Sequence, residues 1–135
     1  MLKLINSNFI SIFIFASTPG FAGYKAPPNV VQITSLSNGE TIATGIMGDV
    51  RATNDSIQLI GCSLTAVKGG NAPEINCVAL TNSGSYVACW TTNGFYAGQV
   101  MSINRNSKIT FRSDANKQCT FLEIVNGSSF RPMDP

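Results

Sequence analysis

Residues 56–80, SIQLIGCSLTAVKGGNAPEINCVAL, decide the fold of this chain. Two runs of mainly apolar residues, 56–67 and 74–80, flank KGGNAP, a loop rich in Gly, Asn and Pro. This pattern predicts two antiparallel strands joined by a hairpin. If the chain folds back at the Gly-Gly pair, Cys62 and Cys77 lie opposite each other. The stretch therefore predicts a β-hairpin that a disulfide can close.

The four cysteines and the absence of histidine limit what sulfur can do in this protein. Gaps of 15, 12 and 30 residues separate the cysteines, whereas a zinc site would show close pairs or histidines. We therefore expect no metal and no other cofactor. An even number of exported thiols is expected to pair. The favoured pairs are Cys62–Cys77 and, by elimination, Cys89–Cys119, with Cys77–Cys89 as the main competitor.

The pair Cys89-Trp90 also occurs at the nucleophile of papain-like cysteine proteases, but the similarity stops there. That nucleophile needs an imidazole as its base, and this chain contains no histidine. The residues before Cys89 are Tyr-Val-Ala, not the Cys-Gly-Ser of that family. We predict that Cys89 is a disulfide partner and that the chain contains no catalytic residue.

Short β-rich runs separated by turn residues continue along the chain and predict its architecture. The spacing of Phe95, Val100 and Met101 within 91–104 also predicts one short helix. We expect a single α+β, β-dominated domain: an antiparallel meander sheet of about six or seven short strands, one short helix and two disulfides. An all-β sandwich is the alternative. The candidate strands are 30–35, 40–47, 56–67, 74–81, 85–91, 107–112 and 118–125.

Three aromatic residues, Trp90, Phe95 and Tyr96, lie beside small polar residues at the predicted strand-to-helix turn. Binding surfaces favour this mixture, so these three are the candidate ligand-binding residues. Strict alternation points Trp90 away from Cys89. For Trp90 taken by itself, a core side chain is the favoured interpretation and a ligand platform is the alternative. In the last strand, strict alternation puts Cys119 and Phe121 on one face.

The N-terminal residues have the three-part pattern of a secretory signal. Lys3 precedes an apolar run at 9–16, and small residues around Phe21 predict cleavage near Ala22. The apolar run is shorter than the roughly 20 residues that a membrane-spanning helix needs. We expect a secreted or periplasmic protein without a membrane anchor. Its parts are a signal peptide (1–22), an extended N-terminal arm (23–29), a disulfide-stapled β-rich domain (30–130) and a C-terminal tail (131–135).

The charge of the exported part argues against nucleic acid or anionic lipid as the partner. Removing Lys3 with the signal leaves eight of the nine Lys and Arg against seven Asp and Glu, a net charge of about +1. The polarity comes instead from Asn, Ser and Thr. This surface favours a protein or a glycan as the partner.

The expected function is that of a small exported, non-enzymatic binding module, such as an inhibitor or a surface-interaction protein. The first alternative is a small carboxylate-dependent hydrolase acting on polysaccharide, which needs two carboxyl groups facing each other in a cleft. The second is a structural or toxin-like subunit that assembles through exposed strand edges.

Overall fold

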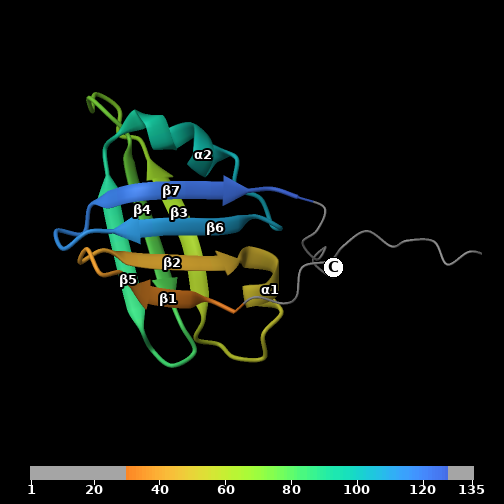
Figure 1. Ribbon diagram of the computed structural model, residues 1–135. Coiled ribbons are helices and arrows are strands. Elements are labelled where there is room, and N and C mark those ends of the chain that lie inside the picture. The colour runs from red at the N-terminus through yellow and green to blue at the C-terminus, as the bar shows by residue number, and fades with distance from the viewer. Residues whose placement is uncertain (1–29, 128–135) are drawn as a thin grey trace, which may run out of the picture.

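A computed structural model describes residues 30–127 as one β-dominated domain of two antiparallel sheets (Figure 1). In Figure 1 the strands of the first sheet lie in front of the second sheet and run across its strands. The first sheet has the order β1 (Gln32–Ser35), β2 (Thr41–Ile46), β6 (Lys108–Ser113) and β7 (Cys119–Val125). The second has the order β3 (Leu59–Thr65), β4 (Glu74–Leu80) and β5 (Tyr86–Thr91). The helical segments are α1 (Met47–Arg51), η1 (Gly94–Tyr96) and α2 (Ala97–Met101).

The β-dominated class, the seven strands and both disulfides are confirmed. The strands divide between two sheets, as in the sandwich alternative, because β6 pairs with β2 rather than with β5. The predicted helix corresponds to η1 and α2, and Asn93 caps it by accepting a hydrogen bond from the Phe95 N–H. The single turn α1 was not predicted. The signal peptide and the arm, residues 1–29, lie outside the described residues, as do residues 128–135.

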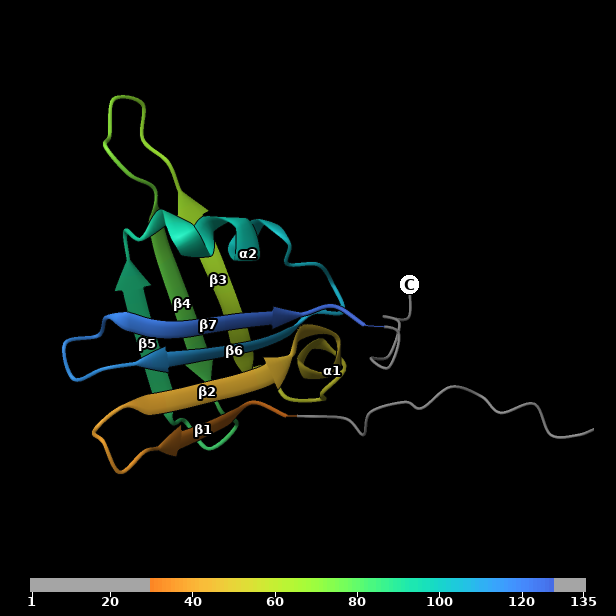
Figure 2. The same cartoon turned by 45° about the horizontal axis from the view of Figure 1, so that its top comes forward.

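The predicted hairpin forms with the predicted register. Cys62 of β3 lies directly opposite Cys77 of β4, with their Cα atoms 4.0 Å apart, and the two form a disulfide. The connecting loop extends beyond both sheets at the top of Figure 2. The turn residues therefore set the register, and the register brings the two cysteines together.

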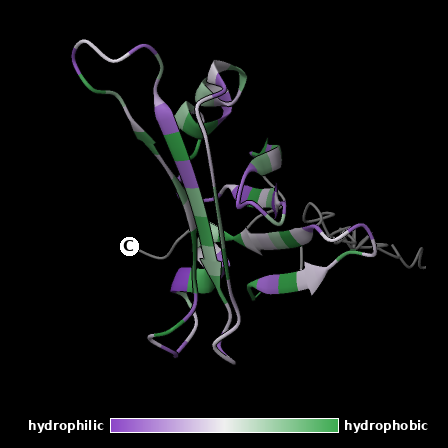
Figure 3. Cartoon of the chain, turned by 90° about the vertical axis from the view of Figure 1, so that its left-hand side faces the viewer, coloured by the Kyte–Doolittle hydropathy of each residue, from purple (hydrophilic) through white to green (hydrophobic). Residues whose placement is uncertain are grey.

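The core lies between the two sheets and is formed by the side chains on one face of each sheet. Hydrophobic and hydrophilic residues alternate in bands along the upright strands in Figure 3. Gly45 of β2 permits a close approach of the sheets, because a Cβ atom there would lie 3.2 Å from the Ile60 side chain. The buried core residues of the strands include Ala43, Ile109, Phe111 and Leu122 from the first sheet and Ile60, Ile75, Cys77, Val87 and Cys89 from the second.

A β-bulge at the start of β7 turns Cys119 into the core. Arg112 pairs with Phe121, but the next residue, Ser113, pairs with Cys119, so Thr120 is an extra residue. The prediction that Cys119 and Phe121 share a face was therefore wrong, because one inserted residue reverses the alternation. The Thr120 carbonyl accepts a hydrogen bond from the Tyr96 hydroxyl at 3.3 Å.

The bulge allows a covalent link between the two sheets. Cys119 of β7 forms a disulfide with Cys89 of β5, the edge strand of the second sheet, and their Cα atoms are 4.9 Å apart. Two hydrogen bonds form beside this link. The Trp90 N–H donates to the Lys117 carbonyl at 2.8 Å, and the Ser113 hydroxyl donates to the Ala88 carbonyl at 2.9 Å. We call this region, where β5 meets the β6–β7 turn, the corner.

Removing either disulfide is expected to destabilise the fold by several kcal/mol. Restricting the unfolded chain contributes about 3 kcal/mol for the Cys62–Cys77 loop and about 3.6 kcal/mol for the longer Cys89–Cys119 loop. The double variants Cys62→Ala/Cys77→Ala and Cys89→Ala/Cys119→Ala should each show losses of this order in urea unfolding followed by circular dichroism. An unchanged unfolding midpoint in either variant would contradict the structural role assigned to that disulfide.

Candidate functional site

The outer faces of the two sheets differ in polarity. On the first sheet, Gln32, Thr44, Thr110 and Glu123 form one row across the four strands, and the two threonine hydroxyls are 3.0 Å apart. The apolar ring of Phe121, in a neighbouring row, has the Arg112 guanidinium 5.0 Å from its centroid. The other rows, Ile42–Arg112–Phe121 and Ile46–Lys108–Val125, combine apolar residues with a charged one. The face thus keeps to the usual rule that the solvent side of an antiparallel sheet carries polar groups.

The outer face of the second sheet breaks that rule. Its side chains point away from the core, and three of the large apolar ones are exposed: Leu59 by 41%, Tyr86 by 63% and Trp90 by 43%. We call this surface the aromatic face. Its three rows across β3, β4 and β5 are Leu59–Leu80–Tyr86, Gly61–Val78–Ala88 and Ser63–Asn76–Trp90.

The two aromatic side chains border a shallow groove with a small floor. The groove has a volume of about 170 Å³, and Tyr86, Ala88 and Trp90 of β5 line it together with Val78 and Asn76 of β4. Tyr86 and Trp90 are four residues apart on an extended strand, so their Cα atoms are separated by about 13 Å. Ala88 lies between them and projects little. Two large rings therefore stand at the ends of a low apolar floor.

The structure separates the three predicted site residues. Trp90 points away from Cys89, as alternation predicted, but its exposure shows that the core interpretation was wrong. The inward positions of β5 are already taken by Val87, Cys89 and Thr91, which are buried. Trp90 therefore lies on the aromatic face.

Phe95 and Tyr96 lie in η1, on a different part of the surface. Phe95 is 75% exposed, and its ring contacts the Tyr96 ring edge-on with centroids 5.6 Å apart. Tyr96 packs against the core and donates its hydroxyl hydrogen bond to the bulge. The groove beside Trp90 is lined by Tyr86 and not by these two residues. Tyr86 was missed, although its place four residues before Trp90 in SYVACW puts both on one face.

Several carboxylates organise turns. Asp55 accepts hydrogen bonds from the backbone N–H groups of Ile57 and Gln58 and from the Gln58 side chain. These hydrogen bonds lower the pKa of Asp55 to about 2, and the one from the Gln58 backbone has the largest effect. The hydrogen bond from Thr120 is the largest cause of the lowered pKa of Glu40. Asp114 accepts from the backbone of Asn116 and Gln118.

A second hollow lies beside α1 and differs in chemistry. Met47 and Ile103 line it together with Arg51, Asn104 and Arg105, all three of which are exposed. Two guanidinium groups would favour an anion, but these are solvated side chains at a helix end and in a loop. The aromatic face is the stronger candidate for a binding site. Tyr86 and Trp90 lie on β5, and the Cys89–Cys119 disulfide and the hydrogen bond from Trp90 to Lys117 hold this strand in place at the corner.

Comparisons with known proteins found no match: no protein family, curated protein or solved structure matches this chain. Within residues 30–127 no helix is long and apolar enough to span a membrane. The candidate function therefore depends on the geometry of the site itself.

The lowered pKa of Asp55 predicts a pH-dependent contribution to stability. Because the folded pKa, about 2, lies below the ordinary value of 3.8, the contribution is fully present above about pH 4 and is lost as the pH falls towards 2. The stability difference between the wild type and Asp55→Asn should therefore shrink over this range.

Urea unfolding at several pH values measures this difference. The neighbouring exposed Asn54→Ala variant provides the control, because its difference from the wild type should not depend on pH. An Asp55→Asn difference that stays constant from pH 6 to pH 2 would contradict the assigned hydrogen bonds.

Proposed function

We propose that this protein is a small exported, non-enzymatic binding module that holds a neutral glycan on the aromatic face. The observation that carries the proposal is the placement of Tyr86 and Trp90 on one solvent-facing side of β5, with Ala88 between them. Large aromatic rings exposed on a supported strand offer rigid amphipathic contact area at low entropic cost.

The charge of the aromatic face favours a neutral ligand. Its three rows contain no Asp, Glu, Lys or Arg. Two residues of opposite charge border these rows. Glu74 lies on the same side of β4 and accepts a hydrogen bond from the Asn76 side chain at 2.8 Å, and Lys117 lines the groove. A glycan offers apolar C–H faces to the rings and hydroxyl groups to polar partners. The Tyr86 hydroxyl and the Trp90 indole N–H are suitable partners, as is the side-chain carbonyl of Asn76, whose amide nitrogen donates to Glu74.

The size of the face favours a narrow ligand over a folded protein. Three strands spaced by about 4.8 Å and some 20 Å long span roughly 200 Å². A stable protein–protein interface buries about 800 Å² on each partner. A short oligosaccharide lying along β5 fits these dimensions better than a protein surface does.

The disulfides support the exported location. Both disulfides fit an extracellular or other non-cytoplasmic protein, since they persist in oxidising compartments. We propose that residues 1–22 are a signal peptide removed after Ala22, which leaves a secreted or periplasmic protein.

The environment of Asp55 and Glu40 argues against a general-acid role for these two carboxylates. A general acid of a glycosidase needs a raised pKa, whereas the pKa values of Asp55 and Glu40 are lowered by hydrogen bonds. Asp55 stabilises the turn before β3 through Gln58, whose side chain accepts a hydrogen bond from the Val31 N–H. These contacts give the two carboxylates a structural role.

Binding is tested with neutral oligosaccharides of two to six sugars. Trp90 is the only tryptophan, so a ligand on the aromatic face should change the intrinsic fluorescence and protect it from quenching by acrylamide. In calorimetric titrations, Tyr86→Ala and Trp90→Ala should each weaken binding at least tenfold, a loss of about 1.4 kcal/mol.

The control variant is Phe95→Ala, which removes a more exposed ring that does not line the groove and should leave the affinity unchanged. All three variants should unfold at the wild-type urea concentration, because each changes a solvent-facing side chain. Saturable binding that survives both Tyr86→Ala and Trp90→Ala would contradict the site, and the absence of binding to the whole panel would contradict the ligand class.

A further inference from the structure

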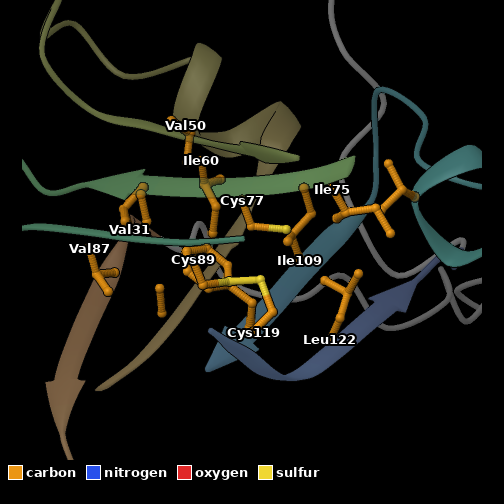
Figure 4. Packing of buried hydrophobic residues seen from close by; sticks show 14 residues of the cluster. Val31, Val50, Ile60, Ile75, Cys77, Val87, Cys89, Ile109, Cys119 and Leu122 are labelled. Atoms are coloured by element: carbon orange, nitrogen blue, oxygen red, sulfur yellow. A yellow bond between two sulfur atoms is a disulfide. The ribbon is translucent and has the colours of Figure 1, made fainter. Parts of the chain in front are cut away.

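The four sulfur atoms of the two disulfides form one cluster between the sheets. Cys62, Cys77 and Cys89 occupy directly facing positions on β3, β4 and β5, and Cys119 reaches the same region from β7. The Sγ atoms of Cys77, Cys89 and Cys119 all lie within 4.8 Å of one another. Figure 4 shows the Cys77 sulfur beside the Cys89–Cys119 bond. A thiolate formed at Cys77 would therefore lie close to the Cys89–Cys119 bond.

We propose that this cluster is a thiol-exchange site, in which opening of Cys62–Cys77 transfers the second disulfide from Cys89–Cys119 to Cys77–Cys89. The exchange is inferred from the positions of the sulfur atoms alone and does not require a glycan as the ligand of the aromatic face. Disulfides exchange when a thiolate attacks one sulfur and the other leaves as a thiolate. A small-molecule thiol supplied by the surroundings, such as glutathione, starts the sequence.

The first step takes place at Cys62, the most accessible of the four cysteines. Cys77, Cys89 and Cys119 are buried, whereas Cys62 is partly exposed on edge strand β3. The external thiolate attacks the Cys62 sulfur, a mixed disulfide forms there, and Cys77 leaves as a thiolate. One disulfide breaks and one forms, so the number of disulfide bonds does not change.

The second step uses the neighbouring bond. The Cys77 thiolate attacks the Cys89 sulfur, the Cys77–Cys89 bond forms, and Cys119 leaves as a thiolate that takes a proton from water. Residues that face each other in an antiparallel pair have Cα atoms about 4.5 to 5.5 Å apart, within the range that a disulfide spans. The strand register thus already provides the geometry of the product.

The exchange changes which elements are joined. Before the exchange, the Cys89–Cys119 disulfide joins β5 of the second sheet to β7 of the first. After the exchange, the remaining intramolecular disulfide, Cys77–Cys89, lies within the second sheet. The hydrogen bond from Trp90 to Lys117 lies at the same corner. The site therefore allows an external thiol to open the covalent link between the sheets without entering the core.

The native protein with both disulfides intact provides the first test. It is incubated with a limited amount of glutathione near pH 8.5, where an ordinary thiol is about half ionised, then acidified, alkylated with iodoacetamide and mapped by mass spectrometry. The expected product has glutathione on Cys62, a Cys77–Cys89 bridge and alkylated Cys119. A product with glutathione on Cys62, alkylated Cys77 and an intact Cys89–Cys119 bond would overturn the proposal, as would initial attack on Cys119.

Two matched variants separate the exchange from simple reduction. Cys62→Ala leaves Cys77 as a thiol beside the second disulfide and should accumulate the Cys77–Cys89 bridge with Cys119 free. Cys77→Ala instead leaves Cys62, outside the close group of three sulfurs, and should keep Cys89–Cys119. Equal retention of Cys89–Cys119 in both folded variants would overturn the proposal. If Cys62→Ala does not fold, the products from the native protein decide the question.

Discussion

The covalent bond between Cys89 and Cys119 is the constraint on which the rest of the structure depends. It attaches β5, an edge strand of one sheet, to the start of β7 in the other. Because the Cys89 side chain is fixed in the core, alternation directs the neighbouring Ala88 and Trp90 side chains outward. The hydrogen bond that Trp90 donates to Lys117 then satisfies part of the strand edge. The same corner thus links the sheets and presents the aromatic face.

The two disulfides make a large contribution to the stability of this domain. A domain of about 100 residues has a net stability of only some 5 to 15 kcal/mol, and two disulfides supply a contribution of comparable size. Cys77 and Cys89 also serve as buried apolar side chains in the core. This bracing adds to the burial of apolar side chains in a domain that leaves Tyr86 and Trp90 exposed.

Local sequence signals predicted the parts of this fold that local interactions determine. The Gly-rich loop set the register of Cys62 and Cys77, which in turn left Cys89 and Cys119 as the second pair. The pairing of β2 with β6 could not be read in the same way, because it joins residues more than 60 positions apart and depends on packing. The extra residue Thr120 has no composition signal, yet it decides that Cys119 faces inward. For the candidate site, alternation predicted that the Trp90 side chain points away from Cys89. It did not predict that this side chain is exposed, because exposure depends on whether another element packs against the outer face of the sheet.

We infer that the corner holds β5 in place and so preforms the aromatic face. Amide hydrogen exchange measured by NMR tests this most directly, residue by residue. We expect the Trp90 amide, which is bonded to the Lys117 carbonyl, to be protected nearly as strongly as the Cys89 amide inside the sheet. The Tyr86 amide, which alternation directs to the open edge of the same strand, should exchange rapidly. Exchange at Trp90 as fast as at Tyr86 would show that the corner is not closed and would contradict this inference.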